Sequence, residues 1–347
     1  MSSIVTVMAD EIAEQPDAVR RTLAALLPLR DDLREAFADR RRVLFVARGS
    51  SDNAATYGRY LLEACAGVSA GPAAPSIATH YRTDLDLTDT LLVAVSQSGA
   101  TTEIVECVDW ARSHGAAIVS VTNVADSPLA KGADVALVTR AGPELAVPAT
   151  KTYLTQLVAM AVLADALGAD LESDLDRVAD EVASAVRSAD LVEPAVALLR
   201  DAAHVVVTGR GLCLGTALET ALKIEETSLT PVRGYSYADL RHGPISVIEP
   251  SVVAVLVAAS DGPMLEPMTD LADDLRRRGA QVVGIGGDAP FARACDVHVP
   301  GPDLPESVAP LGLAVPAQLL VERLARARGH DPDNPRGLAK VTRTDSH

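Results

Sequence analysis

This sequence has few aromatic residues and too few basic residues to balance its acids. Phe, Trp and Tyr make up 3% of the 347 residues, and 47 acidic against 31 basic side chains give a formal net charge of −16. A surface this negative argues against nucleic acid or an anionic membrane as the main partner. A small phosphorylated ligand remains possible, because the N-terminus of a helix can bind an anion locally.

The few cysteines form neither a metal motif nor a redox motif. None of the four is at CxxC spacing, and each stands in an apolar run, so we expect small buried side chains. They are Cys65, Cys107, Cys213 and Cys295. We predict no metal site and no cofactor.

Targeting signals are also missing. The first sixteen residues contain acids and no basic n-region, which argues against a signal peptide. No apolar run looks long enough to span a bilayer. We therefore predict a cytoplasmic protein with no membrane partner. Its length allows one large domain or two medium ones, and 48% apolar residues allow a real core.

What the sequence does contain is a repeat. Residues 41–63 and 202–226 both read as a β-branched strand, a glycine turn and a helix. Two pairs of anchors share an offset of 162 residues: Arg48-Gly49 with Arg210-Gly211, and Asp134 with Asp296. The repeat predicts a duplicated α/β domain, each copy with three α/β/α layers and a mainly parallel sheet that binds ligands at the C-terminal strand ends.

The predicted domain organisation follows from the repeat. Its parts are an N-terminal helical segment (1–37), a first subdomain (38–165), a helical connector (166–200), a second subdomain (201–329) and a C-terminal tail (330–347). The tail has no hydrophobic period, so we expect an extended segment that is ordered by packing on other parts.

A loop rich in hydroxyl groups follows one strand of the first copy. The stretch SQSGATTE (96–103) opens a helix, and Gly99 lets backbone amides approach a ligand closely. Its polar groups are Ser96, Gln97, Ser98, Thr101 and Thr102. The loop has no Lys or Arg, which favours a small phosphomonoester over a nucleoside triphosphate. Ordinary helix capping is the alternative, but it needs only one hydroxyl.

The neighbouring turns refine this prediction. Ser51, in the Gly-Ser turn after the preceding strand, could join the same pocket. The matching loop of the second copy, ASDGPM (259–264), carries Asp261, which would repel phosphate. We therefore expect one phosphate site per chain.

The helix ALETALKIEETS (217–228) carries Glu219, Lys223 and Glu226 on one face among apolar residues. Aldose–ketose interconversion needs a carboxylate near the carbon that loses its proton and a cation near the developing enediolate oxygen. Lys223 is one turn from both acids, so it can pair with one while the other faces substrate. The alternative is a solvent-facing ladder of salt bridges with little energetic weight.

Seven motifs in order resemble the sugar isomerase (SIS) family, in particular the isomerase half of glutamine-dependent glucosamine-6-phosphate synthases and the stand-alone aminosugar-phosphate deaminases. The motifs are EIAEQP (11–16), RGSSDNA (48–54), SQSGATTE (96–103), AVPATKTYLTQL (146–157), ALETALKIEETS (217–228), YADLRHGP (237–244) and DNPRGLAK (333–340). The resemblance implies SIS-type subdomains, a phosphosugar substrate and a homodimer.

The resemblance also implies residue roles. Glu226 would move a proton between C1 and C2, His242 would open the sugar ring, Lys223 and Glu219 would support charge on the sugar oxygens, and Lys340 would close the site. The sugar phosphate would be bound by Ser51, Ser96, Gln97, Ser98 and Thr101, and the backbone of Val147 would line the sugar pocket.

Two departures from the family bear on function. The synthases begin with a glutaminase domain whose nucleophile is an N-terminal Cys, whereas this sequence begins Met1-Ser2-Ser3, so we expect that it cannot draw ammonia from glutamine by itself. The synthases also carry Gly-Glu before the His-Gly-Pro motif, where this chain has the shorter Asp239. That change could alter the placement of His242.

The leading hypothesis is an isomerase-deaminase that converts glucosamine 6-phosphate to fructose 6-phosphate and ammonia. A ketose/aldose-phosphate isomerase and a fructosamine-phosphate deglycase are the enzymatic alternatives. A sugar-phosphate sensor without catalysis is the alternative from another class. A sensor would need the serine loop but not Glu226, His242 or Lys340.

Overall fold

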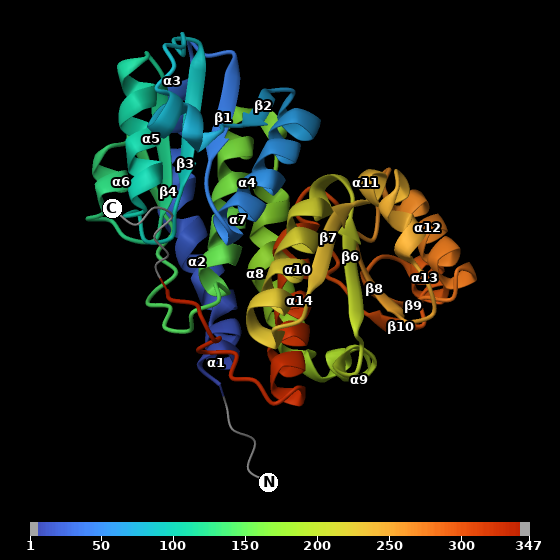
Figure 1. Cartoon of the computed structure of the whole chain (residues 1–347). Coiled ribbons are helices and arrows are strands. Elements are labelled where there is room, and N and C mark those ends of the chain that lie inside the picture. Colours follow the sequence, from blue (N-terminus) through green and yellow to red (C-terminus); the bar gives the residue numbers. More distant parts are fainter. Residues whose placement is uncertain (1–5, 341–347) are drawn as a thin grey trace. The chain divides into compact units, whose positions relative to one another are not determined.

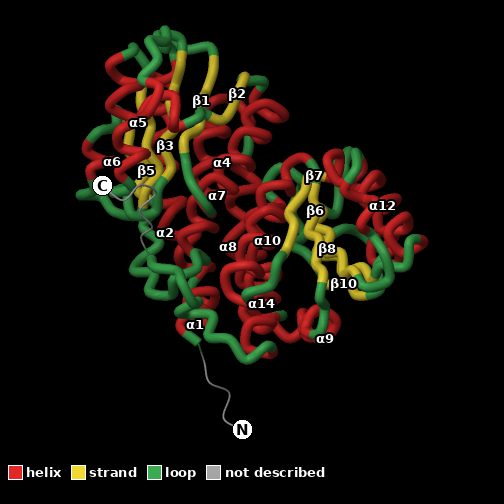
Figure 2. Tube along the Cα trace, in the orientation of Figure 1, coloured by secondary structure: helices red, strands yellow, loops and turns green. Residues whose placement is uncertain are grey.

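The computed structural model describes residues 6–340, and its backbone is drawn in Figures 1 and 2. The chain divides into two compact units whose segments interleave along the sequence. The first-copy unit comprises Asp17–Glu144, Lys151–Leu175 and Ala339–His347. The second-copy unit comprises Met1–Pro16, Leu145–Thr150 and Asp176–Leu338. The tail beyond residue 340 and the first five residues lie outside the described part.

The first-copy unit is built on a parallel five-stranded sheet of order β2-β1-β3-β4-β5. Its strands are β1 (Arg42–Val46), β2 (Ser69–Pro72), β3 (Thr90–Val95), β4 (Ala117–Thr122) and β5 (Val135–Val138). Its helices are α2 (Gln15–Leu26), α3 (Arg30–Phe37), α4 (Ser50–Leu61), α5 (Thr102–Ser113), α6 (Pro128–Lys131) and α7 (Lys151–Ala164). Every residue of β3 and β4 is buried, as expected of strands covered on both faces. Figure 1 shows α5 and α6 on one face of this sheet and α4 and α7 on the other.

Helix α7 corrects one expectation from the sequence. Residues 151–169 are long and apolar enough, by composition, to cross a membrane, so the expectation that no such run exists was wrong. Every residue of α7 is nevertheless buried, and 83% of the apolar window lies inside the protein. The helix is therefore the central core helix of the first-copy unit, packed against α4.

The second-copy unit has a parallel sheet of order β10-β9-β8-β6-β7. Its strands are β6 (His204–Gly209), β7 (Val232–Ser236), β8 (Val252–Ala258), β9 (Gln281–Gly286) and β10 (Val297–Val299). Its helices are α1 (Val7–Ala13), α8 (Glu172–Arg187), α9 (Glu193–Arg200), α10 (Leu214–Ser228), α11 (Tyr237–Arg241), α12 (Leu265–Arg277), α13 (Ala289–Ala294) and α14 (Ala309–Ala327). Helices α10 and α14 cover one face of the sheet, and α12 and α13 cover the other (Figure 1).

The two sheets have the same strand order, and in each an aspartate just before the last strand accepts the same pair of hydrogen bonds. Asp134 accepts hydrogen bonds from the Ile118 amide (2.7 Å) and from Arg112 (2.8 Å), which ties the start of β5 to β4 and α5. Asp296 does the same in the second sheet. These shared anchors confirm the predicted fold class: α/β, with two three-layer subdomains and parallel sheets.

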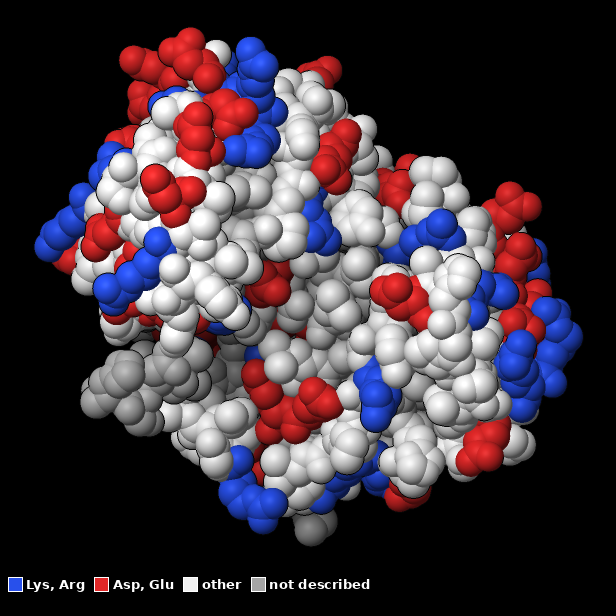
Figure 3. Space-filling model, turned by 45° about the horizontal axis from the view of Figure 1, so that its top comes forward, with Lys and Arg blue, Asp and Glu red and all other residues white. Residues whose placement is uncertain are grey.

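Charged side chains are dispersed over the described part of the surface that Figure 3 shows. Acidic and basic groups alternate there with broad uncharged areas, and no continuous basic field covers this face. A nucleic-acid interface would need such a field.

Candidate functional site

The hydroxyl-rich loop lies at the C-terminal edge of the first sheet. Strands β1 and β3 are adjacent and parallel, with Val46 opposite Ala94, so the turns that follow them emerge at the same edge. The Ser96 hydroxyl is 3.0 Å from the Thr101 hydroxyl across the loop. Gly99 has a φ of +61°, and a Cβ there would lie 2.2 Å from the Ser127 hydroxyl, so no other residue fits.

Two helix N-termini at this edge have no side-chain cap. Thr101 is the N-cap residue of α5, but its hydroxyl makes no capping hydrogen bond and faces Ser96 instead. Gly49 is the N-cap residue of α4 and has no side chain to offer. Ordinary capping therefore does not explain the hydroxyl groups. Backbone amides and hydroxyls at one sheet edge, with the positive ends of two helices, suit a small anion.

Arg48 stands beside this loop, and it is already paired. Arg48 donates to both carboxylate oxygens of Glu103, over 2.8 and 2.7 Å. This bidentate contact raises the pKa of Arg48 above its ordinary value. The charge of Arg48 is directed to Glu103, which agrees with a loop that binds phosphate through hydroxyls and amides.

The first-copy unit also contains a buried acid that the sequence analysis missed. Glu144 has a fully buried side chain and accepts hydrogen bonds from the amide (3.0 Å) and hydroxyl (2.6 Å) of Thr152 at the start of α7. Lys340, from the tail, lies 2.7 Å from the same carboxylate. The Gly-Pro-Glu-Leu stretch at 142–145 resembles Gly-Pro-Asp-Leu at 301–304, and this similarity could have drawn attention to Glu144.

We predict that the Glu144–Lys340 pair holds the end of the described tail. Glu144→Gln and Lys340→Met should each accelerate amide hydrogen exchange at residues 334–340 about tenfold or more, because a charge-assisted hydrogen bond is lost. The same change at the exposed Glu106, also in this unit, serves as the control. Unchanged exchange in both variants would show that the pair does not restrain the tail.

Helix α10 presents the predicted row of charges from a buried face. The side chains of Glu219 and Lys223 are 4% and 3% exposed, and that of Glu226 is 22% exposed. The Lys223 ammonium lies 3.6 Å from Glu219 Oε1 and donates a short hydrogen bond to Glu226 Oε2. The alternative of a solvent-facing ladder is therefore wrong. Lys223 contacts both acids, and Glu226 is the one that retains access to solvent.

His242 follows α11 and has an exposed side chain. Asp239, the shorter acid three residues earlier, is engaged locally: it accepts a hydrogen bond from the Ser236 hydroxyl over 2.6 Å. Ser236 in turn caps α11 through the Asp239 amide. Asp239 thus stabilises the turn before His242, and the imidazole remains available to a ligand.

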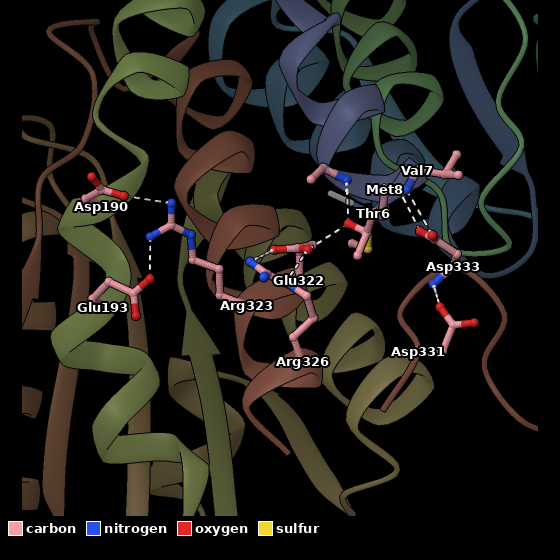
Figure 4. A network of polar contacts seen from close by, with 11 residues as sticks. Thr6, Val7, Met8, Asp190, Glu193, Glu322, Arg323, Arg326, Asp331 and Asp333 are labelled. Carbon is pink, nitrogen blue, oxygen red and sulfur yellow. Dashed lines mark hydrogen bonds and ion pairs between the residues drawn. The ribbon is translucent and has the colours of Figure 1, made fainter. Parts of the chain in front are cut away.

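The predicted sugar-pocket residue Val147 is positioned by the tail. Its amide donates to the backbone carbonyl of Asp333 over 2.9 Å. The Asp333 carboxylate accepts from the amides of Val7 (2.9 Å) and Met8 (2.7 Å), and so caps the N-terminus of α1. Figure 4 shows the contacts of the Asp333 carboxylate with Val7 and Met8 beside the Thr6–Glu322 hydrogen bond. Asp333 is a second residue that the sequence analysis missed.

The candidate residues divide between the two units. Among them, Ser96 contacts Thr101 in the first-copy unit, and Lys223 contacts Glu219 and Glu226 in the second-copy unit. The first-copy unit holds Ser51, Ser96, Gln97, Ser98, Thr101 and Lys340. The second-copy unit holds Val147, Glu219, Lys223, Glu226 and His242.

The cysteines are mostly as expected. Cys107, Cys213 and Cys295 are buried, and burial raises the pKa of each thiol to about 12, so they stay protonated at neutral pH. Cys65 is only partly buried, which corrects the expectation for that residue. Among the described residues, no group of three or more His, Cys, Asp or Glu side chains is placed to hold a metal ion.

Comparison with known proteins agrees with this architecture. The SIS-domain family model matches residues 36–166 and again 198–326. The chain belongs to the SIS family.

Three relatives show the range of proteins that it resembles. Glutamine–fructose-6-phosphate aminotransferase (isomerizing) of Pyrococcus horikoshii is 34% identical over 343 residues, which cover 96% of this chain and 57% of that protein. The C-terminal domain of glucosamine-fructose-6-phosphate aminotransferase from Francisella tularensis has a TM-score of 0.87 at 26% identity, covering 96% and 99% of the two chains. Glucosamine-6-phosphate deaminase from Thermotoga maritima has a TM-score of 0.78 at 26% identity, covering 97% and 99%.

Proposed function

We propose that this chain is a phosphosugar isomerase, and more specifically an isomerase-deaminase that converts glucosamine 6-phosphate to fructose 6-phosphate and ammonia. The observation that carries the proposal is the buried row on α10, where Lys223 lies between Glu219 and the more accessible Glu226. Burying the charges of Glu219 and Lys223 is costly, and a solvated surface helix would not require it. Such a row suits proton transfer beside a developing negative charge.

The proposed chemistry gives each residue a defined step. The loop at 96–101 binds the phosphate, and His242 protonates the ring oxygen so that the sugar opens to an aldehyde at C1. Glu226 removes the proton from C2 and returns it to C1, while Lys223 stabilises the negative charge that develops on the oxygen at C1. The nitrogen at C2 is then held as a ketimine, and water hydrolyses it to the ketone and ammonia.

The likeness to a deaminase of known structure supports the deaminase reaction. This chain spans 57% of the aminotransferase of Pyrococcus horikoshii but aligns with 99% of the Thermotoga maritima deaminase. The cytoplasmic location stays a proposal. The homodimer, in which His242 would serve the active site of a neighbouring chain, is a proposal as well.

The decisive assay couples ammonia released from glucosamine 6-phosphate to glutamate dehydrogenase. We expect ammonia, fructose 6-phosphate and exchange of the C2 proton with solvent. Ketose formation from another hexose phosphate without ammonia would favour a plain isomerase, and ammonia-free cleavage of a fructosamine phosphate would favour a deglycase. Tight binding without ammonia or proton exchange would contradict catalysis and leave the sensor.

Ser98→Ala tests the phosphate loop. Loss of one charge-assisted hydrogen bond should weaken glucosamine 6-phosphate binding by about 1.5–3 kcal/mol, or about ten- to a hundredfold in Kd, with the fold intact. Titration calorimetry measures the change. Ser113→Ala, at the opposite end of α5, is the matched control and should leave Kd unaltered. Equal affinity in the two variants would remove Ser98 from the site.

A further inference from the structure

The second-copy unit repeats the strand pair that carries the candidate phosphate loop. Strands β6 and β8 are adjacent and parallel, as β1 and β3 are, and the turn 259–264 after β8 corresponds to the loop 96–101. Helix α12, which follows this turn, has no side-chain cap at its N-terminus. The backbone of a second anion crevice is therefore present.

The chain itself fills this crevice. Glu306, from the loop between β10 and α14, directs its carboxylate at the turn: a Cβ on Gly262 would lie only 2.0 Å from Glu306 Oε2, and one on Gly211 would lie 3.7 Å from Oε1. The Glu306 amide donates to Asp261 Oδ1 over 2.7 Å, which fixes the loop in place. Glu306 thus places carboxylate oxygens where the oxygens of a bound anion would lie.

The position is electrostatically unfavourable for Glu306. Burial, and the charge of Asp261 beside it, raise the pKa of the Glu306 carboxyl above its ordinary value. Arg210 lines the same crevice, but its guanidinium lies over the Tyr237 ring, 4.4 Å from the centroid. The Cys213 thiol is the remaining titratable group there, and it stays protonated. Within the described residues, the Glu306 carboxylate has neither a hydrogen bond nor an ion pair, so stability does not explain its presence.

We propose that Glu306, together with Asp261, closes the second crevice to anions, so that the chain binds one phosphorylated ligand and not two. The inference rests on the proposed phosphate site in the first-copy unit. It adds a residue to the sequence-based expectation, which rested on Asp261 alone. The close approach of the Glu306 carboxylate to Gly262 adds to the preference for glycine that the φ of +85° there already imposes.

Equilibrium dialysis with inorganic phosphate tests the inference by stoichiometry. Wild type should bind one phosphate per chain, and Asp261→Ser/Glu306→Ala should bind two. Asp270→Ser/Asp303→Ala removes the same formal charge from exposed positions and should still bind one. The inference would be overturned if the folded double variant bound no additional phosphate, or if wild type already bound two phosphates per chain. A wild type that binds no phosphate would instead contradict the proposed function. In that case, one phosphate bound by the double variant would still support the closure of the second crevice.

A second measurement does not depend on opening the crevice. An acid with a raised pKa in the folded state contributes stability below its unfolded pKa, and that contribution is lost as pH rises through the folded pKa. Glu306→Gln should therefore raise Tm relative to wild type at pH 7 and lose this advantage at pH 4. Asp303→Asn is the control on the same loop. A Glu306→Gln variant with no gain at pH 7 would show that the carboxylate is not held against electrostatic repulsion, and would overturn the closure.

Discussion

Glu226→Gln is expected to lower kcat for ammonia release by about a hundredfold or more while leaving KM nearly unchanged. The substitution keeps the shape of the side chain and can retain a contact with Lys223, but it removes the group that accepts the C2 proton. An interaction needed mainly in the transition state affects kcat and not ground-state binding. Coupled ammonia assays over a range of glucosamine 6-phosphate concentrations separate the two parameters.

The neighbouring Glu225 provides the matched control. It is exposed, and its side chain accepts a hydrogen bond from the Val232 amide, which a glutamine can also do. Glu225→Gln should therefore keep both kcat and KM. Exchange of the C2 proton with solvent gives an independent reading, and it should disappear in Glu226→Gln alone. Wild-type exchange in Glu226→Gln would transfer the role of base to another residue.

The sequence predicted the architecture well because its signals are local or repeated. Buried β-branched strands, glycine turns and an offset of 162 residues were enough to predict two parallel sheets of one topology. The same reasoning placed Glu219, Lys223 and Glu226 on one helix face, since residues three and four apart must be neighbours there. It did not recognise the apolar window at 151–169, where polar residues interrupt the run: Lys151, Thr152, Thr155, Gln156 and Asp165.

What the sequence could not predict are contacts between distant segments. Lys340 and Glu144 are 196 residues apart, and nothing local to either indicates their pairing. The cap that Asp333 provides to α1 spans more than 300 residues and depends on how the tail packs. Glu306 reads as an ordinary loop acid until its distance from Gly262 is known. In each case an acid gains its significance from burial and partners, which only the tertiary structure supplies.

Lys223→Met is expected to lower the free energy of unfolding by about 3–5 kcal/mol, the usual penalty for removing one partner from a buried ion pair. The Lys223 side chain is 3% exposed, and its ammonium faces Glu219, which is 4% exposed. Without that cation, the Glu219 carboxylate stays buried without its main compensating charge. Urea unfolding followed by circular dichroism measures the loss.

Two further variants separate charge from packing at this position. Lys223→Met/Glu219→Gln removes both members of the pair, so it should be more stable than Lys223→Met alone, because the penalty comes from the uncompensated acid. Lys131→Met is the surface control: Lys131 and its partner Asp126 have side chains 67% and 97% exposed, and the change should stay within about 0.5 kcal/mol of wild type. If Lys223→Met proved as stable as this control, the α10 row would not behave as a buried ion pair. The positioning of Glu226 by Lys223, on which the proposed proton transfer depends, would then lose its physical basis.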